Sequence, residues 1–200
     1  MTSVSAFMEL AARRTGHFQM ESGLHSAMWL DLDALFASPV RIEPFVSALA
    51  NMLRPFQVDA VCGPMLGGAF LAQRIAQLIG AEFWYTAPAA PTDVAGLYRA
   101  RYRLPQAFDR RLSHPRVVLV DDVMSAGSSL RATNEELRLH SEVVAVGAIL
   151  RLANVGADYF ALQGVPVTAV VQQAFEIWTP EECPLCRAGT PLERPVTIVA

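Results

Sequence analysis

The chain has 200 residues, of which 52% are hydrophobic and 18% are charged, with 13 prolines and 12 glycines. This composition excludes a disordered chain, and the length fits a single domain, 1–200, with a full core better than two domains of ordinary size. The formal net charge of -3 removes the bulk electrostatic attraction for polyanions, so we expect no nucleic-acid partner.

Membrane and export signals are not expected. The apolar runs, such as 143–150, are far shorter than the roughly 20 residues that span a bilayer. The pair Arg13 and Arg14 follows the first apolar stretch instead of preceding it, which is the wrong order for a secretory signal. We therefore expect a cytoplasmic protein. All 16 basic residues are Arg, so no lysine is available for a Schiff base or as a general acid.

Helices and strands alternate along the first half of the sequence. Apolar residues at i, i+3, i+4, i+7 and i+11 from Ile42 predict one buried face of a helix that ends before Pro55. A strand is predicted at 58–62, a helix at 66–79 that Gly80 closes, and a strand at 82–86.

The second half begins with an irregular stretch, 87–115, which is too long for an ordinary connection and rich in Pro and Arg. Apolar strands are then predicted at 117–120, 143–150 and 166–171, with a helix at 128–140. Apolar strands that alternate with helices indicate parallel βαβ units. The predicted class is therefore α/β, with helices on both faces of a parallel sheet.

The residues after the strand at 117–120 have the character of a ligand site, because ligands of open α/β sheets bind beyond the carboxyl ends of the strands. Asp121 and Asp122 are adjacent acids that require a ribose diol, a metal ion or a basic neighbour. The small residues 125–129 open a helix and offer backbone amides to a phosphate. Together the two features match the two ends of a ribose 5-phosphate. The alternative is that the acids merely end a strand and that Ser125 or Ser128 caps a helix.

This motif resembles the signature of the type I phosphoribosyltransferases, which bind phosphoribosyl pyrophosphate (PRPP). Within that family, segments 16–18, 22–26 and 182–187 are similar to orotate phosphoribosyltransferases, and 63–68 falls where the family has its pyrophosphate loop. The resemblance implies a type I phosphoribosyltransferase fold with a small hood from the N- and C-terminal segments. It also implies transfer of ribose 5-phosphate from PRPP to a nitrogenous base, with orotate as the first choice, Mg²⁺ as cofactor, and a homodimer.

The resemblance assigns a role to each part of the site. Asp121 and Asp122 would hold the ribose hydroxyls and metal-bound waters, without binding Mg²⁺ directly, and Arg101 and Arg103 would close over the pyrophosphate. The 5-phosphate would lie on Ser125, Ala126, Gly127, Ser128 and Ser129, the pyrophosphate on Met65, Leu66, Gly67 and Gly68, and the base near Glu21, His25, Trp29 and Arg151. The two loop arginines, with Arg99, are equally compatible with a solvated charged loop or with a surface hairpin strand that has one polar face.

Two departures from the family leave the acceptor base open. Glu21 stands where family members commonly have lysine, and Arg151 begins a segment that differs from the usual base-binding sequence. There are therefore two alternatives. The chain is a related transferase that acts on a purine or another base, or it is a PRPP-sensing regulator without catalysis.

Cys183 and Cys186 have the spacing of half a zinc site. The four histidines show no paired spacing that would supply two more ligands. Structural thiols are therefore the favoured interpretation, and a metal or redox role is the alternative.

Overall fold

The structure is a computed structural model that describes residues 2–32, 35–90, 96–109 and 114–195. Its centre is a six-stranded sheet with the strand order β5-β4-β3-β6-β7-β8. The strands β3, β4, β6, β7 and β8 are parallel, and the short edge strand β5 runs antiparallel to β4. The strands span Ala60–Pro64 (β3), Glu82–Ala89 (β4), Arg101–Arg103 (β5), Arg116–Met124 (β6), Glu142–Arg151 (β7) and Val167–Gln172 (β8).

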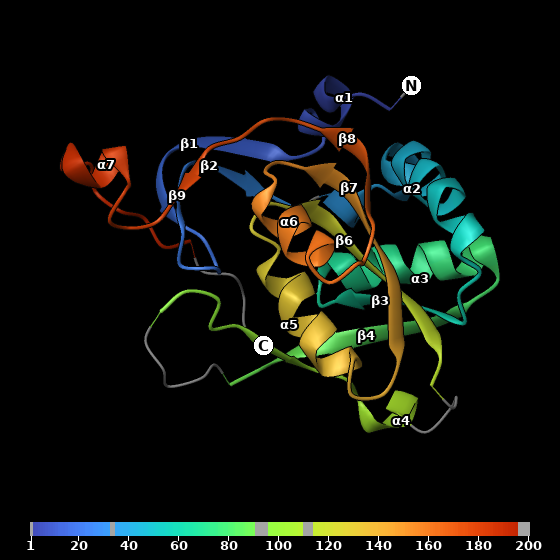
Figure 1. Cartoon of the computed structure of the whole chain (residues 1–200). Helices are drawn as coiled ribbons and strands as arrows, with labels where there is room; N and C mark the ends of the chain where they lie inside the picture. Colours follow the sequence, from blue (N-terminus) through green and yellow to red (C-terminus); the bar gives the residue numbers. More distant parts are fainter. Residues whose placement is uncertain (1, 33–34, 91–95, 110–113, 196–200) are drawn as a thin grey trace.

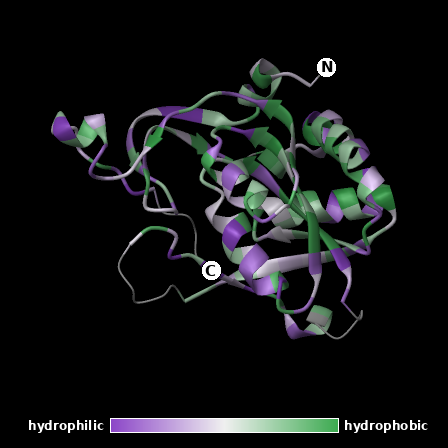
Figure 2. Cartoon of the chain, in the orientation of Figure 1, coloured by the Kyte–Doolittle hydropathy of each residue, from purple (hydrophilic) through white to green (hydrophobic). Residues whose placement is uncertain are grey.

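Helices cover both faces of this sheet (Figure 1). The helices α2 (Pro39–Leu53) and α3 (Gly67–Ile79) pack on one face, and α5 (Ser128–Leu137) and α6 (Val155–Ala161) pack on the other. Alternate residues of β6 serve the two cores: Val118 and Val120 pack toward α2 and α3, and Val117 and Leu119 pack toward α5 and α6. Figure 2 shows these central strands as largely hydrophobic, as expected for a sheet that is covered on both sides.

A separate three-stranded antiparallel sheet forms the hood (Figure 1). Its order is β1-β2-β9, with β1 at Ala12–Gln19, β2 at His25–Asp31 and β9 at Ile177–Trp178. The short helix α7 (Pro184–Arg187) lies beyond the hood at the far left of the view. The remaining short helices are α1 (Val4–Met8), η1 (Leu35–Ala37), η2 (Arg54–Phe56) and α4 (Gln106–Asp109). The expected α/β class and the hood from the two terminal segments are both confirmed.

Several element boundaries differ from the prediction. The first central strand begins at Ala60 instead of 58, and α5 ends at Leu137 instead of 140. The strand β6 does not stop at 120 but continues to Met124, because its last residues still pair with β7. The stretch 87–115, predicted as irregular, contains the end of β4 together with β5 and α4; its residues 91–95 and 110–113 lie outside the described part. Among the described helices, none is long and apolar enough to cross a membrane.

Candidate active site

The acid pair lies at the carboxyl end of β6, beneath the hood. Asp121 and Asp122 are each only 7% exposed. The Ser129 hydroxyl donates a hydrogen bond of 2.8 Å to Asp121 Oδ2, and the Asp122 amide donates one of 3.1 Å to Asp121 Oδ1. The Val123 amide donates to Asp122 Oδ1 over 2.7 Å. The acids are therefore part of the strand and are held in fixed orientations.

The electrostatics of the pair favour a cationic or diol ligand. Burial raises the pKa of Asp121 well above its ordinary value, and the negative charges of Asp122 and Glu21 raise it further. The hydrogen bonds from Ser129 and from the Asp122 amide act in the opposite direction but do not reverse the shift. A cleft with several acids and a raised carboxyl pKa is stabilised by a ligand that brings positive charge or hydroxyl donors.

The expected phosphate cradle, 125–129, follows directly after β6. Gly127 is the N-cap residue of α5 and has a φ of 72°, a left-handed conformation that favours glycine, and no side chain caps the helix. The alternative in which Ser125 or Ser128 caps this helix is therefore wrong. The Ser129 hydroxyl binds Asp121, and no side chain caps the helix. The first-turn amides of this ten-residue helix therefore stay available to an anion.

The glycine loop after β3 approaches the acids closely. A Cβ atom on Gly67 would lie 2.1 Å from Asp122 Oδ2, and one on Gly68 would lie 2.9 Å from Asp121 Oδ1. The preceding peptide bond, Met65 to Leu66, is cis. Only glycine allows this loop to pass so near the carboxylates, so the predicted pyrophosphate loop and the acid pair belong to one site.

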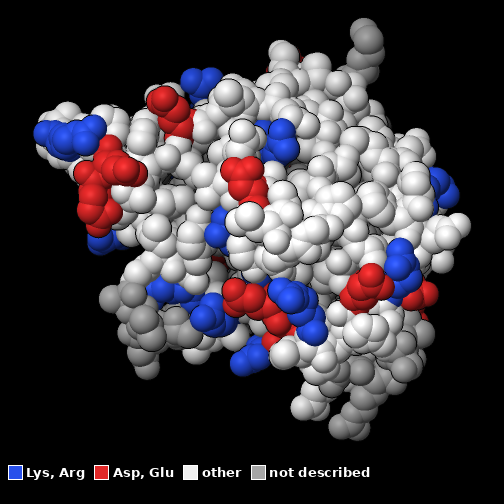
Figure 3. All heavy atoms as spheres, in the orientation of Figure 1, with Lys and Arg blue, Asp and Glu red and all other residues white. Residues whose placement is uncertain are grey.

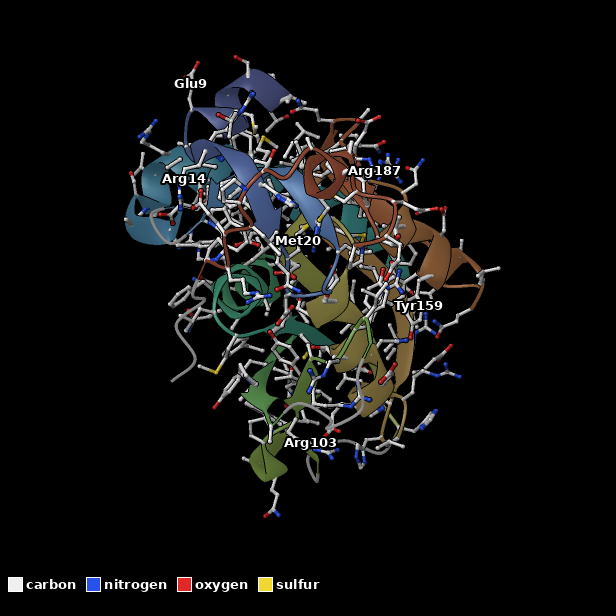
Figure 4. All side chains as sticks on the ribbon, turned by 90° about the vertical axis from the view of Figure 1, so that its left-hand side faces the viewer. Glu9, Arg14, Met20, Arg103, Tyr159 and Arg187 are labelled. Carbon is white, nitrogen blue, oxygen red and sulfur yellow. The ribbon has the colours of Figure 1, made fainter. Side chains whose placement is uncertain are left out.

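These parts share one cleft of about 500 Å³ between the hood and the sheet. Figure 4, viewed from the hood side, shows Met20 of its lining near the middle of the molecule and Arg103 far below it. Of the predicted residues, the cleft is lined by Glu21, Trp29, Met65, Leu66, Gly67, Asp121, Asp122, Ser125 and Ser129. Ala126 and Gly127 lie in the turn before α5, and Gly68 and Ser128 lie in the first turns of α3 and α5, without lining the cleft.

Tyr102 is a cleft residue that the sequence analysis missed. It is 7% exposed and donates a hydrogen bond of 3.1 Å to Glu21 Oε1. Desolvation raises the pKa of Glu21, and burial and the Glu21 charge raise that of Tyr102, which keeps the phenol a donor. The signal was present as alternation: in an extended Arg101-Tyr102-Arg103 segment the aromatic residue faces opposite to its neighbours.

The two predicted catalytic arginines lie outside this cleft. Arg103 forms a 2.7 Å ion pair with Glu136 of α5, and Arg101 lies 3.6 Å from Glu135. Figure 3 shows basic and acidic side chains next to one another in the lower half of this surface of the molecule. Their strand β5 is the surface hairpin strand that was the alternative interpretation. Arg101 still lines an adjoining hollow of about 510 Å³, together with Arg99 and Glu21.

Two of the predicted base-binding residues also lie outside the cleft. Arg151 donates a 2.5 Å hydrogen bond to Gln172 Oε1 and lines a neighbouring hollow instead of the cleft. His25 is buried in the hood, 3.1 Å from His17. The cation that does line the cleft is Arg14, which pairs with Glu193.

The sequence spacing of the histidines gave no sign of two further ligands, but the structure brings His17 and His25 to Cys183 and Cys186. The ligand atoms of four residues lie within 4.8 Å of one another, and we call them the His/Cys cluster: His17, His25, Cys183 and Cys186. The histidines come from neighbouring antiparallel strands, β1 and β2, so their sequence spacing does not follow a short motif.

Comparison with known proteins gives a consistent result. The chain is 32% identical over 190 residues to an orotate phosphoribosyltransferase of Caldanaerobacter subterraneus, covering 94% of this chain and 93% of that protein. It is 30% identical over 193 residues to the enzyme of the same name from Caldicellulosiruptor bescii, covering 96% and 94%. No protein-family model matches the chain.

Solved structures show the same fold. A crystal structure of orotate phosphoribosyltransferase from Aeropyrum pernix superposes with a TM-score of 0.64 at 21% identity, covering 80% of this chain and 88% of that one. An adenine phosphoribosyltransferase from Thermoanaerobacter pseudethanolicus also gives 0.64, at 16% identity, covering 84% and 99%.

Proposed function

Because this chain belongs to the orotate phosphoribosyltransferase family, we propose that it transfers ribose 5-phosphate from PRPP to orotate, giving orotidine 5'-phosphate and pyrophosphate. The observation that carries the proposal is the convergence of the buried acid pair, the phosphate cradle and the glycine loop at one cleft. Each has the chemistry of one part of PRPP: hydroxyls, 5-phosphate and pyrophosphate.

In this reaction the protein mainly positions the reacting groups and takes part in no covalent bond. A ring nitrogen of orotate forms a bond to the anomeric carbon of the ribose and gives up its proton to the surrounding water. The bond from that carbon to the pyrophosphate oxygen breaks with its electron pair on pyrophosphate. Positive charge develops on the ribose ring in between. Asp121 and Asp122 lie where they would hold the ribose hydroxyls and stabilise that charge, and the cradle would anchor the 5-phosphate.

Mg²⁺ fits the donor set of this cleft. Carboxylate oxygens and phosphates are the ligands that Mg²⁺ prefers, and it commonly retains several waters. Asp121 and Asp122 would hold such waters, and Glu21 adds a third carboxylate on the other wall. When bound, the ion would neutralise charge on the pyrophosphate. The side chains of Asp121 and Asp122 meanwhile keep the ribose in place.

Glu21, Trp29 and Tyr102 line the cleft, and the proposal assigns the base to them. The indole offers an apolar face to a planar ring, and the raised pKa of Glu21 reduces its repulsion of an anionic base. Arg14 lies on the same wall and can attract the orotate carboxylate. Arg101 and Arg103 would reach pyrophosphate only after leaving their partners on α5, as a closing loop would require.

The proposal includes an assembly and a location. We expect one domain per chain and a homodimer, in which the segment around β5 extends toward the neighbouring site. None of the three cysteines of the described part forms a disulfide, which suits the cytoplasm. Gel filtration with light scattering measures the assembly.

A base screen tests the function. With PRPP and Mg²⁺ present, pyrophosphate release is measured with orotate, uracil, adenine, hypoxanthine and xanthine in turn. We expect turnover with orotate and loss of it in the Asp121→Asn, Asp122→Asn double variant, whose fold is checked by circular dichroism. Rapid release with a purine but not with orotate would overturn the orotate assignment. Binding of PRPP without turnover on any base would instead indicate a PRPP-sensing regulator.

A further inference from the structure

The His/Cys cluster lies outside the proposed active site and has the dimensions of a metal centre. His17 comes from β1, His25 from β2, Cys183 directly precedes α7, and Cys186 lies within it. None of the four lines the described cleft. Both histidines and Cys183 are at most 3% exposed, and Cys186 is exposed.

Four of the six distances between the ligand atoms are close to the edges of a tetrahedron around zinc, and all four ligand atoms lie within 4.8 Å of one another. With Zn–N of about 2.0–2.1 Å and Zn–S of about 2.3 Å, the edges should be about 3.3 Å between two nitrogens and about 3.6 Å between nitrogen and sulfur. His17 Nε2 lies 3.1 Å from His25 Nδ1, 3.4 Å from Cys183 Sγ and 3.7 Å from Cys186 Sγ. Cys186 Sγ lies 3.2 Å from His25 Nδ1. Each of these edges is within about 0.4 Å of the ideal value.

The second nitrogen of His17 determines which way its lone pair points. His17 Nδ1 lies 2.8 Å from the carbonyl oxygen of Thr190, which can only accept, so Nδ1 carries the proton and Nε2 presents a lone pair to the cluster. This contact is the carbonyl-to-histidine arrangement that commonly orients zinc ligands. Three other groups converge on that one lone pair, and hydrogen bonds alone cannot satisfy all of them. A cation at their centre satisfies all four ligands.

We propose that the His/Cys cluster binds one Zn²⁺ ion with a structural role. Two thiolates and two imidazoles select zinc over Mg²⁺ or Ca²⁺, which prefer oxygen ligands. Four protein ligands leave no open position for substrate or water, so the ion is structural and not catalytic.

The ion would attach the C-terminal segment to the hood. The helix α7 has four residues, too few to be stable alone, and β9 contributes only two residues to its pairing with β2. One of those pairs joins His25 to Trp178. The metal would therefore join β1, β2 and α7 at one point and hold the hairpin that carries Glu21 and Trp29. This inference is independent of the base on which the enzyme acts.

Metal analysis tests the proposal directly. The protein, prepared without a polyhistidine tag or chelator, should contain one zinc per chain by inductively coupled plasma mass spectrometry. Removing zinc with a chelator should lower the melting temperature, and adding Zn²⁺ should restore it. Zinc at a hundred times its Kd raises the ratio of folded to unfolded protein about a hundredfold.

Cobalt gives a spectroscopic test that does not depend on activity. Co²⁺ added to the zinc-free protein should produce the thiolate charge-transfer and tetrahedral d–d absorption bands. The Cys183→Ser, Cys186→Ser double variant should lose both the zinc and the bands, while Cys62→Ala, which removes a buried thiol of β3 outside the cluster, should retain them. Wild-type protein without stoichiometric zinc, whose cobalt spectrum equals that of the double variant, would overturn the proposal. So would an intact mass that shows a Cys183–Cys186 disulfide in the purified protein.

Discussion

Replacing Asp121 by Asn is expected to weaken PRPP binding and, at the same time, to stabilise the ligand-free protein. Asn has the same shape, and its carbonyl oxygen can accept from the Asp122 amide while its amide donates to the Ser129 hydroxyl. The variant therefore keeps both local hydrogen bonds and loses only the charge. Loss of one charged hydrogen bond to the ribose costs about 1.5–3 kcal/mol, which is a roughly 10- to 150-fold weaker Kd for PRPP.

The effect on stability follows from the raised pKa of Asp121. The folded state holds this proton more tightly than the unfolded state, whose carboxyl titrates near 3.8. Stability from this group is therefore fully present below about pH 3.8 and is lost as the pH rises through the folded-state pKa. Asn does not titrate. The difference in the free energy of unfolding, variant minus wild type, should accordingly grow as the pH rises above about 4 and then level off.

Two measurements on the same proteins check this reasoning. Titration calorimetry with PRPP and Mg²⁺ gives the Kd, and urea unfolding between about pH 4 and 8 gives the stability difference. The control is Asp59→Asn, at the opposite end of the sheet, where an exposed carboxylate accepts from the Arg116 amide; it should leave the PRPP affinity unchanged. An Asp121→Asn variant that binds PRPP as tightly as wild type, or that is less stable at neutral pH, would refute the argument.

Three further predictions concern the glycine loop, the cleft residue Glu21 and the surface ion pair of Arg103. Gly63→Ala would place its Cβ 2.0 Å from the backbone oxygen of Gly68, so we expect about 1–3 kcal/mol of lost stability in thermal unfolding and a raised KM for PRPP. Glu21→Gln should abolish a rise in the KM for orotate that wild type shows as the pH increases through the raised pKa of Glu21; a flat wild-type profile would contradict this. Arg103→Ala should cost only about 1 kcal/mol in urea unfolding, because its ion pair with Glu136 is largely exposed on the arginine side, and a much larger loss would argue against that estimate.

The central sheet could be predicted because its signals are local. The helical spacing from Ile42 and the apolar run at 143–150 each report burial within one element, and both elements are present. The ends of the strands were harder to predict where pairing with a neighbouring strand decides them. Asp121 remains in β6 because it pairs with Ala148 of β7, and polar residues in sequence usually indicate that a strand has ended.

The candidate site also combines features that are local in the sequence with features that depend on tertiary structure. The acid pair and the phosphate cradle lie next to each other in sequence, so their chemistry could be inferred from one motif of 14 residues, 117–130. The alternation around Tyr102 shows that it faces opposite to its neighbours. Neither Tyr102 nor Arg14 could be assigned to the cleft from the sequence, because they reach it only through the pairing of β5 with β4 and of β1 with β2. His25 was assigned to the base for lack of this tertiary information, and it lies in the hood beside His17.

The two sides of the cleft are held in place by different parts of the fold. The half that is proposed to bind ribose and phosphate is built from β3, β6 and the segments that follow them, all anchored in the main core. The half that faces the base is built from the hood, whose strands come from opposite ends of the chain and are joined by few backbone pairs to β9. Loosening the hood should therefore raise the KM for the base more than that for PRPP. Removing the proposed zinc ion would separate the two effects, because none of its four proposed ligands lines the cleft.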